Sequence, residues 1–427
     1  MTIIQKIKER IPIAEIARRY VPDLKDHVSG KRLLGSCPFH EQRTGSFNID
    51  PVKGRFHCYS CGRHGDLIEL VEEVEGLSKK DAIHKLALEA GIEPETKTAP
   101  TEQQKQEQRL KKAFSAAQDA YSQGLWAKDS PGLHYMRNRG VSDDTLKEFE
   151  VGFSPASYSK AVSAAVQKSG VSIKEALDFN VLAKSSKGNV YDPMFGRVVF
   201  PIYSEKQHLV GFGGRIIDKD SDVAKYKNTS SFQKGAFVFG LKQAVPHIRR
   251  SGKAIVVEGY MDVLAMHQAG FKNCVGTMGT AITTAQLHSI RKHCPCIIFL
   301  MDGDSAGQTA TMQALDRAIK AGFNVQVALL PDGADPDDFV RKNGHDSMQA
   351  LLNEAVCGLE MWLRHLDETS AAELSCWVGD FLKAVADPIA KIVWAKRIGK
   401  FLGVSAQELL DAVAQATTAP SEDKEAV

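Results

Sequence analysis

The sequence predicts a multi-domain α/β protein. Three observations lead to this: a cysteine and histidine pattern near the N-terminus, a strand–helix alternation after residue 253, and a helical pattern beyond residue 339. At 427 residues the chain has room for two to four domains. Its 43% hydrophobic and 25% charged residues are typical of a soluble protein, and its apolar runs are too short to span a membrane. We therefore expect a cytoplasmic protein without a membrane partner.

Residues 1–95 form the first expected unit. An amphipathic helix over 3–11 is followed by a stretch with many glycines and prolines and then by two helices. Ser78 and Asp81 mark the start of the second of these helices, and Gly91 marks its end. Residues 96–108 are polar and poor in apolar side chains, which predicts a flexible linker.

Four residues of the first unit have the spacing of metal ligands. Cys37, His40, Cys58 and Cys61 form a C-x2-H-x17-C-x2-C pattern. Each two-residue gap allows a tight turn to direct two ligands at one ion, and the long gap accommodates a hairpin with strands over 45–49 and 54–57. Four ligands close the coordination sphere, so the pattern predicts a structural zinc ribbon. The alternative is a set of buried cysteines without a metal.

The zinc unit is basic, with twelve Lys/Arg against six Asp/Glu in residues 1–65. Basic side chains interleaved with aromatic ones can hold single-stranded nucleic acid through its phosphates and bases. We expect Lys31, Arg55 and Tyr59 to make such contacts. The alternative for each charge is a solvated surface.

Residues 109–252 are predicted to form a mixed α+β, basic subdomain. A helix is expected over 110–126, Ser142 caps a short helix, and 198–203 reads as a strand. Residues 197–253 carry eleven Lys/Arg against four Asp/Glu. The glycines at 211–214 lack the spacing of a dinucleotide fingerprint and predict a tight turn that presents Arg215.

Residues 253–338 alternate in the manner of a parallel, doubly wound sheet. Strands over 254–257, 274–276, 296–301 and 325–330 alternate with helices over 260–269, 283–293 and 305–321. Beyond the sheet, 339–415 is expected to be a helical subdomain with Trp362, Leu363, Trp377 and Phe381 in its core. The acidic, polar residues 416–427 are expected to be disordered.

Acidic residues follow three of these strands. They are Glu258, Asp302, Asp304, Asp335 and Asp337. Open α/β sheets bind ligands beyond the carboxyl ends of their strands, so we expect these carboxylates to converge on one crevice. Converging carboxylates repel and need a cation, and hard oxygen ligands select Mg²⁺ or Mn²⁺, the metals of phosphoryl transfer. The alternative reading of a strand-end aspartate is a helix cap.

The segments VVEGYMDV, MDGDSAG and DGADPDD resemble the Toprim domain. Together with the zinc pattern, they make residues 1–415 similar to bacterial DnaG-type DNA primases. The resemblance implies a zinc domain that reads the template and a Toprim-containing RNA polymerase domain that makes short RNA primers on single-stranded DNA. The acids at 302, 304, 335 and 337 would bind the catalytic metals, and Glu258 would bind metal or transfer a proton. Arg139, Arg215 and Lys225 would bind template or nucleotide phosphates.

The resemblance also implies partners. These are a single-stranded DNA template, ribonucleoside triphosphates, a replicative helicase and a single-strand-binding protein, in a nucleoid-associated location. Family members normally carry a further C-terminal domain that docks on the helicase, and we expect it to be lacking from this chain.

Three alternative functions compete with this interpretation. A topoisomerase relative would need a nucleophilic tyrosine in a large additional domain, and a primase–helicase would need a Walker A loop, which the sequence lacks. The third is a non-catalytic zinc-ribbon protein that binds single strands and carries a degenerate Toprim scaffold.

Overall fold

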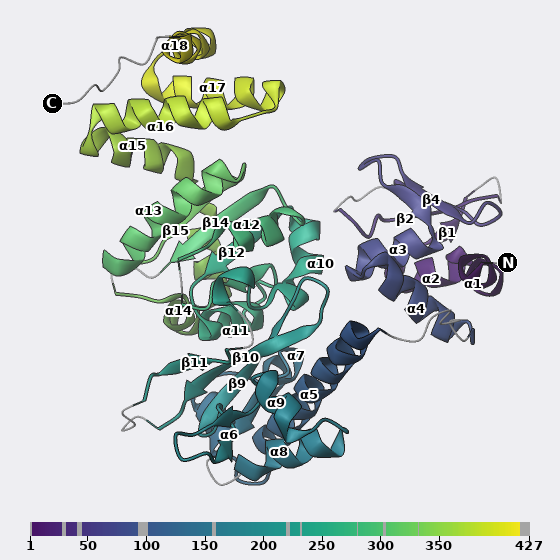
Figure 1. The fold of residues 1–427 in the computed structure, drawn as a ribbon. Helices are drawn as coiled ribbons and strands as arrows, with labels where there is room; N and C mark the ends of the chain where they lie inside the picture. Colours follow the sequence, from purple (N-terminus) through teal and green to yellow (C-terminus); the bar gives the residue numbers. More distant parts are fainter. Residues whose placement is uncertain are drawn as a thin grey trace.

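The computed structural model describes residues 2–27, 31–40, 45–92, 101–155, 159–218, 223–230, 233–279, 281–301, 305–331 and 333–418. A small N-terminal unit lies beside a larger body, and a stack of helices continues that body at its C-terminal end (Figure 1). Among the described residues, no helix combines the length and apolar character needed to cross a membrane.

The N-terminal unit is a five-stranded antiparallel sheet with its helices packed together on one side of it (Figure 1). Its elements are α1 (Ile3–Arg10), α2 (Ile13–Tyr20), β1 (Lys25–Asp26), β2 (Leu33–Gly35), β3 (Phe47–Asp50), β4 (Arg55–Cys58), β5 (His64–Asp66), α3 (Leu67–Glu75) and α4 (Lys79–Glu89). The rings of Phe39, Phe47 and Phe56 pack together with centroids 5.4–6.0 Å apart. Ser78 caps α4 as predicted, accepting a hydrogen bond from the Asp81 amide. The aromatic cluster and the capped helices hold the β3–β4 hairpin in place.

The predicted linker is helical over much of its length. Helix α5 (Glu102–Leu125) begins eight residues before the predicted start at residue 110. Thr101 and Gln104 form a reciprocal capping box there, which satisfies amide donors that a helix start would otherwise leave open. The prediction of a flexible linker over 96–108 is therefore wrong for 102–108, and residues 93–100 lie outside the described part of the chain.

The second unit is built on a four-stranded antiparallel sheet in the order β11-β10-β9-β6. Its elements after α5 are α6 (Pro131–Asn138), α7 (Asp143–Glu148), β6 (Gly152–Ser154), α8 (Ser159–Lys168), α9 (Ile173–Asp178), β7 (Ala183–Lys184), β8 (Val190–Tyr191), β9 (Arg197–Tyr203), β10 (Leu209–Ile216), β11 (Tyr226–Asn228), η2 (Lys234–Ala236) and α10 (Leu241–Ser251). The mixed α+β architecture is as expected.

The glycine-rich segment at 211–214 is not a turn. It lies inside strand β10, where Gly213 pairs with Phe200 and Gly214 pairs with Val199. A Cβ atom on Gly213 would lie 2.5 Å from Cζ of Tyr260, so glycine is required there by the close approach of a neighbouring ring. The prediction of a turn was wrong, because it took the glycines as a sign of backbone reversal.

The third unit is a mainly parallel sheet in the order β13-β12-β14-β15-β16. Its elements are β12 (Lys253–Val257), α11 (Tyr260–Gln268), β13 (Cys274–Gly276), α12 (Thr284–Arg291), β14 (Cys296–Met301), α13 (Ser305–Lys320), β15 (Asn324–Leu329), α14 (Pro336–Asn353) and β16 (Val356–Cys357). The predicted alternation is confirmed, and β16 adds an antiparallel edge. Buried side chains alternate between two apolar cores, so helices cover both faces.

Four helices complete the chain: α15 (Gly358–Thr369), α16 (Ala371–Ala384), α17 (Pro388–Leu402) and α18 (Ala406–Thr418). Of the predicted core residues, Leu363, Trp377 and Phe381 are buried, and Trp362 is partly buried. Helix α18 extends to residue 418, so the predicted disordered tail over 416–427 is wrong at its start. Residues 419–427 lie outside the described part.

The N-terminal unit contacts the larger body through the end of α3. The amide of Gln207, in the β9–β10 turn, donates to the Glu75 carbonyl oxygen at 2.7 Å. The guanidinium of Arg249, on α10, donates to the carbonyl oxygen of Glu73. These carbonyls lie at the negative end of the α3 dipole, so a cation is favourable there.

Candidate functional site

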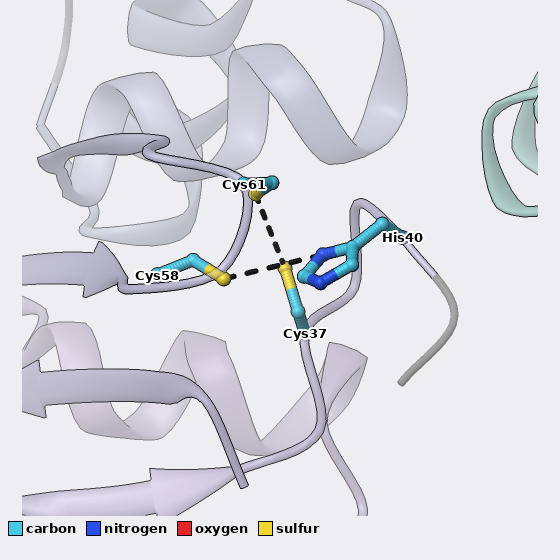
Figure 2. A group of neighbouring side chains, drawn as sticks. All are labelled: Cys37, His40, Cys58 and Cys61. Atoms are coloured by element: carbon cyan, nitrogen blue, oxygen red, sulfur yellow. Dashed lines mark hydrogen bonds between the residues drawn. The ribbon is translucent and has the colours of Figure 1, made fainter. Parts of the chain in front are cut away.

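The structure brings the four predicted zinc ligands together (Figure 2). Cys37 and His40 lie in the loop after β2, Cys58 ends β4, and Cys61 lies in the turn that follows. Their ligand atoms all lie within 4.8 Å of one another. Gly62, with φ of 73°, allows the turn that returns Cys61 towards the other three.

The distances suit a tetrahedral ion. Sγ of Cys37 lies 3.9 Å from Sγ of Cys61, and Sγ of Cys58 lies 4.0 Å from Nδ1 of His40. Zinc–sulfur bonds of about 2.3 Å place tetrahedral ligand atoms about 3.8 Å apart. One histidine and three cysteines therefore fit a structural zinc, with every coordination position filled by protein.

The electrostatics of the ligand thiols differ. Burial raises the pKa of Cys58, but hydrogen bonds from the Ser46 hydroxyl and the backbone near Cys61 outweigh it and bring the pKa down to about 7. Burial raises the pKa of Cys37 above its usual value. Because metals bind the thiolate, Cys58 is better prepared than Cys37 for coordination at neutral pH.

The predicted nucleic-acid contacts of this unit lie on its surface. Lys31 and Arg55 are exposed, and Tyr59 is 65% exposed. The Tyr59 ring meets the His57 ring edge to face at 4.4 Å. Tyr59 is therefore available for contact with a ligand, unlike the buried phenylalanines of the hairpin.

The described residues include three of the five predicted acids. Glu258 follows β12, Asp335 is the N-cap of α14, and Asp337 lies in the first turn of that helix. Asp302 and Asp304 lie outside the described residues. The strand that precedes them, β14, pairs with β12 and β15 at the centre of the sheet.

Three carboxylates at the start of α14 form an acidic cluster: Asp335, Asp337 and Asp338 have oxygen atoms within 4.8 Å of one another. Asp335 also accepts a hydrogen bond of 2.6 Å from the Asp338 amide, so it serves as a helix cap as well. A set of carboxylate oxygens at such separations fits a hard divalent cation, which Asp335 and Asp338 can bind from the rim of the cluster.

Sequence reasoning missed Asp262. This buried residue of α11 accepts a hydrogen bond of 2.8 Å from the Gly259 amide and one of 3.4 Å from the Asp337 amide. It therefore joins the end of β12 to the start of α14. The signal was present, because Asp262 lies in the first turn of the helix that directly follows Glu258 and β12.

Asp337 is held by two arginines. Its side chain is 2% exposed, with Oδ2 at 2.5 Å from Nη2 of Arg139 and Oδ1 at 2.9 Å from Nε of Arg341. Burial raises the pKa of Asp337, and the two guanidinium groups oppose that rise. Arg139, predicted to contact phosphates, thus pairs with a predicted metal ligand 198 residues away.

Arg215 shares its neighbours Tyr135 and Tyr226 with Arg139, and Lys225 lies beside Tyr226. Arg215 donates to the Tyr226 hydroxyl at 2.5 Å, and its guanidinium lies over the rings of Tyr135 and Tyr226 at 5.7 and 5.3 Å. Lys225 is exposed, with its ammonium 6.0 Å from the Tyr226 ring. Arg215 is fixed by aromatic neighbours, whereas Lys225 is available to solvent.

Tyr260 connects the antiparallel sheet of the second unit to the parallel sheet that carries the acids. The ring of Tyr260 stacks on Phe200 at 4.7 Å, and its hydroxyl donates to Oδ1 of Asn228 at 2.8 Å. Because Tyr260 begins α11 and Asn228 ends β11, this contact fixes how the second unit faces the acids. Gly213 leaves the space that the ring needs.

Comparison with known proteins follows this division into units. The family model described as CHC2 zinc finger matches residues 1–102. The model for the N-terminal domain of the DNA primase catalytic core matches 120–245, and the Toprim-like model matches 255–340.

Solved structures share the fold. The zinc-binding and RNA polymerase domains of Aquifex aeolicus primase superpose with a TM-score of 0.63 at 28% identity, covering 96% of this chain and 99% of that one. A DNA primase domain from Pseudomonas aeruginosa gives 0.61 at 28% identity, covering 71% of this chain and 99% of that chain.

Curated relatives agree. A DNA primase of Halalkalibacterium halodurans is 34% identical over 348 residues, which is 80% of this chain and 57% of the relative. A DNA primase of Deinococcus radiodurans is 39% identical over 77% of this chain and 56% of the relative. The chain thus spans a little over half the length of these relatives. It belongs to the DnaG-type DNA primase family.

Proposed function

We propose that this chain is a DNA-directed RNA polymerase that makes short RNA primers on single-stranded DNA. The observation that carries the proposal is the ion pair between Asp337, at the edge of the parallel sheet, and Arg139 of the basic subdomain. Nucleotidyl transfer needs acids for cations and fixed positive charges for phosphates, and this edge of the sheet offers both.

The acids would hold Mg²⁺ or Mn²⁺. Asp335, Asp337 and Asp338 form the described cluster. Glu258 is proposed with them from its place after β12, and Asp302 and Asp304 from their place after β14. A cation bound there would neutralise a triphosphate and lower the pKa of an attacking 3′-hydroxyl. The oxygen-only donor set favours these hard cations over zinc.

The arginines would hold phosphates of the template or of a ribonucleoside triphosphate. Nε of Arg139 and Nε of Arg215 are both buried without a hydrogen-bond partner in the described part of the protein. A buried guanidinium N–H without an acceptor is unfavourable, and a phosphate oxygen would satisfy it. Lys225, exposed beside Tyr226, would extend the same surface.

We further propose that residues 1–95 read the template through Lys31, Arg55 and Tyr59, next to a polymerase formed by the basic subdomain and the sheet. A solved structure of the DnaG primase catalytic domain bound to ssDNA superposes on this chain with a TM-score of 0.60 at 27% identity. It supports single-stranded DNA as the ligand of the polymerase part. A replicative helicase and a single-strand-binding protein remain proposed partners on the basis of kinship.

The test is primer synthesis from ribonucleotides on a defined single-stranded template, with and without Mg²⁺ or Mn²⁺. Asp302→Ala should abolish dinucleotide formation and leave binding of a labelled single strand intact. Asp346→Ala, which changes an exposed acid further along α14, is the matched control and should remain active. Synthesis by Asp302→Ala would contradict the proposed site.

The same assay distinguishes a polymerase from the alternative, a non-catalytic protein that binds single strands. A wild-type protein that binds single strands but forms no dinucleotide with either metal would be a binding module. Mixing Cys58→Ser with Asp302→Ala then tests how the zinc unit acts. Restored synthesis would show that the zinc unit of one chain can serve the acids of another.

A further inference from the structure

Asp337 is buried between two positive charges. Its side chain is 2% exposed, and each of its oxygens faces a different arginine, Arg139 or Arg341. An isolated buried carboxylate costs several kcal/mol, so this pairing stabilises the buried charge of Asp337. The same pairing places positive charge next to the oxygens that a divalent cation would bind.

A divalent cation bound to Asp337 would be repelled by the guanidinium groups of Arg139 and Arg341. Two unit charges about 4 Å apart interact by about 4 kcal/mol at the effective dielectric of a protein surface, and a divalent cation doubles that repulsion. Binding of a cation at Asp337 therefore favours the withdrawal of one guanidinium.

We propose that Arg139 is an exchangeable counter-ion of Asp337, displaced when a divalent cation binds and thereby made available to phosphate. The inference rests on the proposed function, because it takes Asp337 as a cation ligand. It makes Arg139 a positioning residue whose availability depends on cation loading.

The contacts of the two arginines indicate which one moves. Arg341 lies on the same helix as Asp337 and also pairs with Asp338, so a second carboxylate retains it. Arg139 has Asp337 as its one carboxylate partner among the described residues, and its side chain is 31% exposed. It is the C-cap of α6, next to Gly140 with φ of 78°, and so lies at a bend of the backbone.

The exchange has a thermodynamic signature. If Arg139 competes with the cation, its removal must tighten cation binding, and cation binding must weaken the Arg139–Asp337 pair by the same factor. Loss of Arg139 would also leave Asp337 buried with less compensation. The cation-free protein should then melt at a lower temperature than wild type, and Mn²⁺ should raise the melting temperature more.

The experiment measures the Mn²⁺ dissociation constant of the full, zinc-loaded chain by electron paramagnetic resonance of free Mn²⁺, without nucleotide or DNA. Arg139→Gln should bind Mn²⁺ about 3- to 10-fold more tightly than wild type. Arg215→Gln is the matched control for charge. It removes a guanidinium from the same site that contacts tyrosines rather than an acid, and its Mn²⁺ affinity should change by less than about twofold.

A double-mutant cycle locates the effect. In an Asp337→Asn background, Arg139→Gln should no longer tighten Mn²⁺ binding, because the contested carboxylate is gone. Equal or weaker Mn²⁺ binding by Arg139→Gln, or an effect that persists in Asp337→Asn, would overturn the inference alone. A wild-type protein that binds no Mn²⁺ would overturn the proposed cation site as well.

Discussion

Substitution of His267 tests how a buried, neutral histidine contributes to the stability of the fold. The imidazole is buried on α11, its Nε2 donates to the Cys274 carbonyl oxygen at 2.8 Å, and its ring meets Phe149 edge to face at 4.8 Å. Burial lowers the pKa of His267 from its ordinary 6.5 to about 4, and the bond to Cys274 opposes this only in part. The folded protein therefore keeps this histidine neutral at pH values where the unfolded chain binds a proton.

The sign follows from the lower pKa in the folded state. The stabilisation by neutral His267 is complete above about pH 6.5 and is lost as the pH falls towards 4. These two pKa values give a loss of about 2 kcal/mol in the free energy of unfolding between pH 7.5 and pH 5. His267→Gln can still donate to the Cys274 carbonyl but cannot titrate, so its stability should fall by about 2 kcal/mol less over this interval.

Urea unfolding of both proteins at pH 7.5 and pH 5, followed by tryptophan fluorescence, measures the difference. The pKa of His293 is also lowered to about 4 by burial. His293 is present in both proteins, so its contribution to the pH dependence of stability cancels in the comparison. Equal pH dependence in wild type and His267→Gln would refute the argument that a buried neutral imidazole contributes to stability here.

Three further outcomes are expected. Cys58→Ser should lose the zinc ion, measured by atomic emission, and should make residues 1–92 sensitive to protease, because structural zinc contributes folding energy directly; retained zinc would contradict the ligand set. Gly213→Ala should destabilise the protein by about 2–4 kcal/mol in chemical denaturation, because its Cβ collides with the Tyr260 ring; an unchanged midpoint would show that the ring can move freely. Arg197→Lys keeps the charge but cannot make the hydrogen bonds that Arg197 donates to the carbonyl oxygens of Ala224 and Lys225 at 2.9 and 3.2 Å. Hydrogen exchange near residue 225 should therefore accelerate, and unaltered exchange would exclude this anchoring role.

Features whose residues lie close together in the sequence could be predicted from local spacing. Cys58 and Cys61 are separated by a single turn, and the strands from β12 to β15 were found within one residue of their observed starts. Both follow from short-range geometry: a tight turn aims neighbouring ligands at one ion, and buried parallel strands are apolar on both faces. The zinc pattern and the alternation of strands and helices were therefore readable from the sequence.

Tertiary structure decided what depends on an approach from elsewhere in the chain. Gly213 looked like part of a turn, but it lies in strand β10. A glycine is needed there because the Tyr260 ring approaches from α11. The start of α5 was missed because Thr101 and Gln104 cap a helix in a segment whose composition is that of a linker.

The pairing of Arg139 with Asp337 is the clearest case. Each residue was selected for its own chemistry, one as a phosphate contact and the other as a metal ligand, and nothing in the spacing between them indicates an ion pair. The sequence determined which charges gather at the edge of the sheet. Only the folded arrangement decided which carboxylate oxygen faces an arginine and which is left for a cation, because charges act through distance and burial rather than through position along the chain.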